Sequence, residues 1–254
     1  MTAASPILEI RDLTFGFGGN LVTDHVSMSV GTGEFVSIIG PNGAGKTTFF
    51  NVVSGVYKPS GGTITYRGND ITRTGAAQRA RAGMARSFQL TNVFPTLSVL
   101  ENARLAAQAQ GPRRYGLLRP YTAYRRYLDR AQSALELVGL GARLPVPAGS
   151  LSHGDKRKLE LAMVIAADSE ILLLDEPTSG VSAEDVPAMV ALIRKIREVE
   201  GKTVMMVEHK MSVVLDLSDR IAVLHGGKLL AMDTPEKIQQ NETVQAAYLG
   251  QETV

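Results

Sequence analysis

The sequence predicts a protein of the α/β class, and three observations support this. Short runs rich in β-branched residues alternate along the chain with helical patterns, as they do in α/β proteins. The length of 254 residues is enough to bury the core of one large α/β domain, or of a domain with an inserted lobe. Hydrophobic residues make up 44% and charged residues 20%, which is ordinary for a soluble protein.

The expected strands fall into an early group and a late group. Strands near the N-terminus are expected over residues 7–15, 25–30, 34–40 and 62–68. Two apolar core strands follow much later, at 170–176 and 202–209, each bracketed by helical stretches. A hairpin is expected over 220–233, with its turn at Gly226-Gly227.

Residues 91–149 differ in character from the rest. Helical periodicity covers 98–110 and 121–140, and no strand pattern occurs there. We expect a helical subdomain over 91–149, inserted into an α/β core formed by 1–90 and 150–254, all within a single domain spanning 1–254.

Composition excludes several classes of protein. The net charge of +2 argues against a chain dominated by nucleic-acid binding, so no nucleic-acid partner is expected. The absence of cysteine excludes disulfides and thiolate metal sites. The N-terminus lacks the pattern of a signal peptide, and no apolar run approaches the roughly 20 residues that cross a bilayer. If the protein acts at a membrane, another chain must hold it there.

The run "GPNGAGKTT" follows the apolar strand "FVSII" and precedes a plausible helix, "FFNVVSG". It satisfies the phosphate-loop pattern G-x-x-x-x-G-K-[ST] in the strand–loop–helix context that confirms it. Lys46 is expected to reach the β- and γ-phosphates and the Thr47 hydroxyl to bind Mg²⁺. A glycine-rich turn that matches by accident is the alternative. The residues expected to bind nucleotide are Gly40, Pro41, Asn42, Gly43, Ala44, Gly45, Lys46, Thr47 and Thr48.

The run "ILLLDEP" is typical of a buried strand that ends in two carboxylates. Asp175, at the carboxyl end of this strand, suits a contact with Mg²⁺ near the phosphates. Glu176 is placed to orient the attacking water or to accept its proton. A solvated acidic turn ended by Pro177 is the alternative for this pair.

With these motifs in order, nearly the whole chain resembles the ATP-binding subunit of an ABC transporter. The resemblance implies the ABC ATPase fold: a P-loop NTPase core with an N-terminal antiparallel β-subdomain and an inserted helical subdomain. It implies ATP and Mg²⁺ as ligands and hydrolysis of ATP coupled to transport. Lys46, Glu176 and His209 are then the expected catalytic residues.

The stretch "LSHGD" corresponds to the family's signature motif, which closes over the γ-phosphate held by a second subunit. Ser152 offers a hydroxyl, Gly154 allows a backbone N–H to approach closely, and the following helix directs its positive end at an anion. Considered alone, the turn is more simply a helix N-cap, in which Ser152 or Asp155 satisfies the first N–H groups.

Three further positions match the family one by one. Gln89 resembles the Q-loop glutamine, which senses Mg²⁺ and water, so it joins Thr47 and Asp175 as an expected metal contact. His209 resembles the switch histidine that contacts the γ-phosphate. Phe17 resembles the aromatic residue that stacks on adenine, with Phe15 as its competitor. Surface, structural and core-packing roles are the respective alternatives.

Two departures from the family pattern stand out. The signature more usually reads Leu-Ser-Gly-Gly-Gln, and here His153 and Asp155 replace its third and fifth residues. Ser182 stands in the D-loop, where many members carry Asp. The residues expected to carry out hydrolysis are all present.

The segment 85–107, the "LSHGDKRKLELA" form and the "AAYLG" near the C-terminus resemble the branched-chain amino-acid uptake group. The resemblance implies an importer subunit at the cytoplasmic face of the inner membrane. Its implied partners are permease subunits, a second ATP-binding subunit (paralogous or identical) and, indirectly, a solute-binding protein. A urea or amide importer is the alternative, followed by a soluble ABC ATPase without a transport role. A GTPase is disfavoured because no Asn-Lys-x-Asp run occurs.

Overall fold

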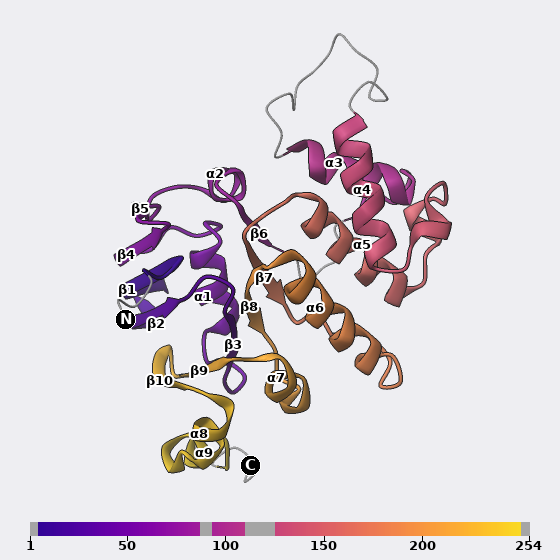
Figure 1. The fold of residues 1–254 in the computed structure, drawn as a ribbon. Helices are drawn as coiled ribbons and strands as arrows, with labels where there is room; N and C mark the ends of the chain where they lie inside the picture. Colours follow the sequence, from indigo (N-terminus) through magenta and orange to yellow (C-terminus); the bar gives the residue numbers. More distant parts are fainter. Residues whose placement is uncertain (1–4, 87–92, 110–124, 250–254) are drawn as a thin grey trace.

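A computed structural model describes residues 5–86, 93–109 and 125–249, and its strands form two sheets (Figure 1). The smaller sheet has four antiparallel strands in the order β2-β1-β4-β5. Its strands are β1 (Leu8–Phe17), β2 (Asn20–Val30), β4 (Gly61–Tyr66) and β5 (Asn69–Asp70). β1 ends two residues beyond the expected strand and β2 begins five residues earlier, because the two pair through to a tight turn in which Phe17 opposes Asn20.

The larger sheet has six strands in the order β10-β9-β3-β8-β7-β6. All its neighbouring strands are parallel except β9 and β10, which form the hairpin predicted at Gly226-Gly227. Its strands are β3 (Phe35–Ile39), β6 (Met84–Arg86), β7 (Ile171–Asp175), β8 (Thr203–Val207), β9 (Arg220–His225) and β10 (Lys228–Asp233). Every residue of β3, β7 and β8 is buried, as expected of parallel strands covered on both faces.

Two hydrophobic clusters cover the two faces of the six-stranded sheet. One includes Phe49, Phe50 and Leu8 and joins this sheet to α1 and the antiparallel sheet. The other includes Leu172 and Ile193 and joins it to the helices on the opposite side. The helices around the core are α1 (Lys46–Val53), α2 (Ala76–Arg81), α6 (Val186–Glu200), α7 (Met211–Leu217), α8 (Pro235–Gln240) and α9 (Glu242–Leu249).

Three further helices pack together on the side of the molecule away from α8 and α9 (Figure 1). They are α3 (Val99–Ala109), α4 (Arg125–Leu137) and α5 (His153–Ala166). Buried alanines such as Ala103, Ala107 and Ala131 lie between them, and small side chains let helices approach closely. The division of the chain at residues 90 and 150 stays a prediction. In the part of the chain that the structure describes, we find no helix both apolar and long enough to cross a bilayer.

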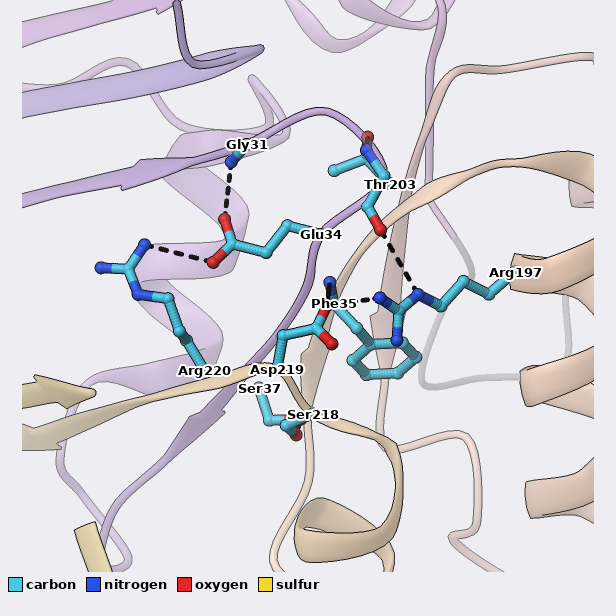
Figure 2. Close-up of polar contacts among 10 residues, drawn as sticks. Gly31, Glu34, Phe35, Ser37, Arg197, Thr203, Ser218, Asp219 and Arg220 are labelled. Carbon is cyan, nitrogen blue, oxygen red and sulfur yellow. Dashed lines mark hydrogen bonds and ion pairs between the residues drawn. The ribbon is translucent and has the colours of Figure 1, made fainter. Parts of the chain in front are cut away.

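Polar contacts fix the amino end of β3 (Figure 2). The Glu34 carboxylate pairs with Arg220 at 3.2 Å. The Asp219 carboxylate accepts a hydrogen bond from the Phe35 backbone N–H at 2.8 Å. Asp219 also pairs with Arg197. Because these groups come from β3, β9 and α6, they fix the register of the central strand at the edge opposite the glycine-rich loop. The carboxyl end of β3 is thereby aligned with those of β8 and β7.

Candidate nucleotide site

Three segments with predicted roles meet at the carboxyl edge of the six-stranded sheet. The loop 40–48 follows β3, the pair Asp175-Glu176 ends β7, and His209 lies two residues beyond the end of β8. Since β3, β8 and β7 are adjacent and parallel, their carboxyl ends lie side by side. Open α/β sheets bind their ligands at this edge.

The loop requires glycine at two positions. Gly40 has φ +156°, and a Cβ there would lie 2.1 Å from the backbone oxygen of Leu224. Gly45 has φ +88°, and a Cβ there would lie 2.4 Å from the backbone oxygen of Val22. The loop can therefore turn tightly against the β1–β2 and β9–β10 hairpins only without side chains at these positions. It then enters α1, whose amino end carries a partial positive charge.

Lys46 is folded against its own loop. Its ammonium group donates to the backbone oxygens of Gly40 at 2.7 Å and Pro41 at 2.8 Å. Burial lowers the pKa of Lys46, and the nearby Glu176 carboxylate acts against that change. Thr47, the second residue of α1, is exposed, so its hydroxyl is open to a ligand at the amino end of this helix.

Asp175 is buried, and its carboxylate accepts a hydrogen bond from the Arg86 guanidinium at 2.8 Å. Burial raises the pKa of the Asp175 carboxyl, whereas Arg86 acts to lower it. Arg86 also donates to Asn51 at 2.6 Å and to Ser54 at 2.7 Å, so it joins β6, β7 and α1. Arg86 was not predicted, because no local pattern in the sequence links it to an aspartate 89 residues away.

Glu176 has a left-handed backbone with φ +49°. For a residue with a side chain this geometry costs about 1–3 kcal/mol and persists where the surroundings fix it. The Glu176 backbone N–H donates to Val207 at 2.9 Å. Its carboxylate lies 3.5 Å from Nδ1 of His209, whose side chain is 52% exposed. A carboxylate and an imidazole thus face the same open edge as the loop.

The donors present fit a magnesium ion that is shared with a nucleotide. Among the described residues there is no group of three or more His, Cys, Asp or Glu that could hold a metal. Mg²⁺ is usually bound through one or two protein oxygens together with phosphate oxygens and water. The Thr47 hydroxyl and the Asp175 carboxylate match that donor set.

Phe17 and Phe15 belong to one aromatic cluster with Tyr57. Phe15 is partly buried and stacks on Tyr57 with ring centroids 5.1 Å apart. The Phe17 ring is perpendicular to both, with centroids 5.0 Å from Phe15 and 5.6 Å from Tyr57, but Phe17 itself is 52% exposed. Of the two phenylalanines, Phe17 has a ring with area free for a flat ligand, which favours it as the adenine contact. The sequence analysis missed Tyr57, which supports both rings.

Replacing Phe17 with alanine is expected to raise the KM for ATP several-fold and to change kcat much less. Base–aromatic stacking is worth about 1–3 kcal/mol, and adenine is remote from the transferred phosphoryl group. Steady-state ATPase kinetics measure both constants. Phe15→Ala is the matched comparison, and the assignment is wrong if that variant alone raises KM.

The turn "LSHGD" forms the start of α5. The Ser152 hydroxyl accepts a hydrogen bond from the Asp155 backbone N–H at 3.1 Å, so Ser152 rather than Asp155 is the N-cap. The Asp155 carboxylate pairs with Arg143 at 3.1 Å. The His153 ring lies against Gly180, where a Cβ would come within 2.7 Å of its Cε1. Both departures from the family pattern therefore make contacts within their own chain.

Two other predicted positions have different outcomes. Gln89 lies outside the residues that the structure describes. The Ser182 hydroxyl donates to the Asp185 carboxylate at 2.7 Å and accepts from the Asp185 backbone N–H at 3.3 Å. In this chain Ser182 therefore shapes the turn that leads into α6.

Comparison with known proteins decides the family. Residues 23–179 match the family described as ABC transporter. The chain belongs to the ABC transporter family. Residues 228–253 also match the family described as branched-chain amino acid ATP-binding cassette transporter. The resemblance found in the sequence is thereby confirmed.

Curated relatives match over nearly their whole length. The chain is 41% identical to the high-affinity branched-chain amino acid transport ATP-binding protein LivG of Salmonella typhimurium, covering 98% of this chain and 99% of the relative. It is 38% identical to the corresponding protein BraF of Pseudomonas aeruginosa, with coverage of 97% and 98%. It is 32% identical to a probable LivG of Archaeoglobus fulgidus, with coverage of 96% and 95%.

Solved structures show the same fold. An ATP-binding cassette of an ABC transporter is similar with a TM-score of 0.84, 27% identity and coverage of 96% of this chain and 99% of that one. A dimeric cassette bound to ADP and phosphate after hydrolysis has a TM-score of 0.76 at 25% identity, with coverage of 90% and 98%. The ABC ATPase fold is confirmed, and the chain is an ATP-binding subunit that hydrolyses ATP.

Proposed function

We propose that this chain is the ATP-hydrolysing subunit of an importer for branched-chain amino acids. The observation that carries the mechanism is the meeting of the loop 40–48, Asp175, Glu176 and His209 at one edge of the sheet. The names of the relatives, which align over almost the full chain, support the substrate class. A urea or amide importer is the second candidate, because that subgroup also carries a histidine in the signature.

In this proposal the loop and Lys46 bind the triphosphate. The backbone N–H groups of the loop and the start of α1 face the β- and γ-phosphates, and Lys46 exchanges its two carbonyl contacts for phosphate oxygens. Thr47 and Asp175 would hold Mg²⁺, with Gln89 as a further expected contact, and the ion would neutralise phosphate charge when bound.

Glu176 acts on the attacking water. Its carboxylate takes a proton from the water as the water oxygen bonds to the γ-phosphorus, and the bond between that phosphorus and the ADP oxygen breaks. ADP leaves with the electron pair of that bond. The His209 side chain lies 3.5 Å from Glu176. Its proposed role is to contact the γ-phosphate.

Ser152 and Gly154 of this chain complete the nucleotide site of a second ATP-binding subunit, which is paralogous or identical. Gly154 lies in the first turn of α5, where glycine costs up to about 1 kcal/mol relative to alanine. A Cβ at this position would have no atom within 4 Å, so packing within the chain does not require glycine there. We therefore attribute the glycine to the close approach of a nucleotide that is bound by another subunit.

The permease partner is expected at an apolar groove between the core and the helical layer. This groove of about 400 Å³ is bounded by α2, β6, α3 and α5, with Val56, Ala77, Ala106 and Met163 in its wall. Arg86 also lines it and contacts Asp175, so an occupant would lie one side chain from the nucleotide site. A membrane partner would hold the chain peripherally at the cytoplasmic face and would receive solute from a binding protein.

The test is reconstitution of the chain with its natural membrane and binding-protein partners in lipid vesicles. ATP hydrolysis should be stimulated by leucine, isoleucine or valine and should drive their uptake. Val56→Asp should reduce co-purification with the permease at least about tenfold, because a charge without a partner is costly in an apolar interface. Val56 is 47% exposed, so the chain itself should still fold.

Val199→Asp is the matched control, since Val199 is 62% exposed on α6 and lies outside the groove. This variant should keep its partners. Stimulation by urea or short amides instead of branched-chain amino acids would select the second candidate. If both valine variants lose co-purification with the permease, or if neither does, the groove is not the docking site.

A further inference from the structure

Glu208 is a buried carboxylate that the mechanism above does not use. It stands between Val207, the last residue of β8, and His209, and its exposed fraction is 0%. A buried carboxylate is costly unless hydrogen bonds satisfy it. Its partners therefore indicate what it contributes.

Both oxygens of the Glu208 carboxylate are used. Oε1 accepts a hydrogen bond from the Thr178 hydroxyl, and Oε2 accepts one from the His209 backbone N–H at 2.9 Å. Thr178 is also fully buried, and its backbone oxygen accepts a hydrogen bond from the Lys210 ammonium at 3.2 Å. One carboxylate thus joins the loop after β7 to the loop after β8.

Each of these loops carries a residue of the hydrolytic site. Thr178 lies two residues after Glu176, and Glu208 directly precedes His209. The Glu176 and His209 side chains are 3.5 Å apart. Glu176 also has a left-handed backbone, which persists only where neighbouring contacts fix it. The contact between Thr178 and Glu208 lies next to this strained residue on one side and next to the histidine on the other.

We propose that Glu208 is a positioning residue that fixes Glu176 relative to His209 through its hydrogen bonds to Thr178 and to the His209 backbone. The proposal rests on the roles proposed above for Glu176 and His209. Because Glu208 is fully buried, it would act through Thr178 and His209 and not on the nucleotide itself. It holds the two loops at the separation that hydrolysis needs, so its loss should affect kcat rather than binding of ATP.

The test replaces Thr178 with valine, which keeps the shape of the side chain and removes the hydroxyl donor. In the assembled complex we expect kcat to fall about 10- to 100-fold, because small displacements of catalytic groups have effects of that size. The KM for ATP should change less than about twofold, since the phosphate-binding loop is untouched. Thr178→Ser should restore kcat because it restores the donor. Glu208→Met, which has a side chain of similar length but no oxygen to accept either hydrogen bond, is a second variant with the same expected split between kcat and KM.

Thr203→Val is the matched control. Thr203 is a buried threonine at the other end of β8, and its hydroxyl accepts a hydrogen bond from the Gly33 backbone N–H at 2.9 Å. This variant should lower the thermal unfolding midpoint to a similar extent and leave kcat unchanged.

Thr178→Val with kcat within about twofold of wild type would overturn the proposal, as would equal losses of kcat in Thr178→Val and Thr203→Val. If Thr178→Val does not fold, the Glu208→Met result decides by the same criteria. Glu176→Gln is measured alongside. If its turnover is normal, the role proposed for Glu176 is wrong, whereas a slow Glu176→Gln beside a normal Thr178→Val rejects this inference alone.

Discussion

Glu176→Gln is expected to hydrolyse ATP about 10²- to 10⁴-fold more slowly than the wild-type chain while still binding Mg·ATP. The amide keeps the size of the side chain but cannot accept the proton that the attacking water releases. The loop 40–48, to which we assign phosphate binding, is unchanged. Turnover at saturating ATP and equilibrium binding of ATP measure the two parts of this prediction separately.

Glu170→Gln is the matched control, because Glu170 directly precedes β7 at the end of the strand opposite Glu176. It pairs with Arg67 at 2.8 Å, and its loss should leave turnover unchanged. Lys46→Ala provides the opposite contrast, since it should weaken ATP binding itself. Turnover of Glu176→Gln close to wild type would reject Glu176 as the catalytic carboxylate.

The parts of the site that lie on continuous motifs could be predicted from sequence. The phosphate loop was recognisable because its glycines, Lys46 and Thr47 stand between an apolar strand and a helix. The strands β7 and β8 were recognisable because fully buried strands are apolar at every position. The order of these strands in the sheet then brings Asp175, Glu176 and His209 together.

Short elements could not be predicted, since periodicity needs length. α2 has six residues and β6 has three, and neither was expected. The first half of β2, "NLVTD", was missed because its polar residues follow Gly18-Gly19 and favour a turn. Pairing with β1 overrides that local preference, which shows how context dominates strand formation.

Polar partners distant in sequence were also missed. Arg86 contacts a residue 89 positions away, and Glu208 contacts one 30 positions away. Neither leaves a spacing pattern, because the parallel sheet and not the local chain brings the pairs together. His209 was predicted from its resemblance to the family's switch histidine, whereas the glutamate before it has no signal apart from its burial.

Gly154→Asp is expected to affect the isolated chain and the working transporter in opposite directions. In the isolated chain a Cβ at position 154 would meet no atom within 4 Å, so the backbone there has room for a side chain. The substitution removes a helical glycine and places a negative charge in the first turn of α5, and each change is worth up to about 1 kcal/mol. The thermal unfolding midpoint should therefore stay equal or rise by about 2–4 °C.

In the assembled complex the same aspartate would stand against the γ-phosphate held by the partner subunit. Repulsion between like charges at an interface costs several kcal/mol, which corresponds to a loss of about 10²-fold or more in turnover. Gly154→Ala separates charge from bulk: it should share the gain in stability and lose less activity than the aspartate variant.

A Gly154→Asp chain that is stable and supports normal ATP-driven transport would mean that "LSHGD" serves only as the cap of α5, where Ser152 already bonds the Asp155 N–H at 3.1 Å. A stable chain that no longer hydrolyses ATP in the complex would place this turn in the nucleotide site of a neighbouring subunit.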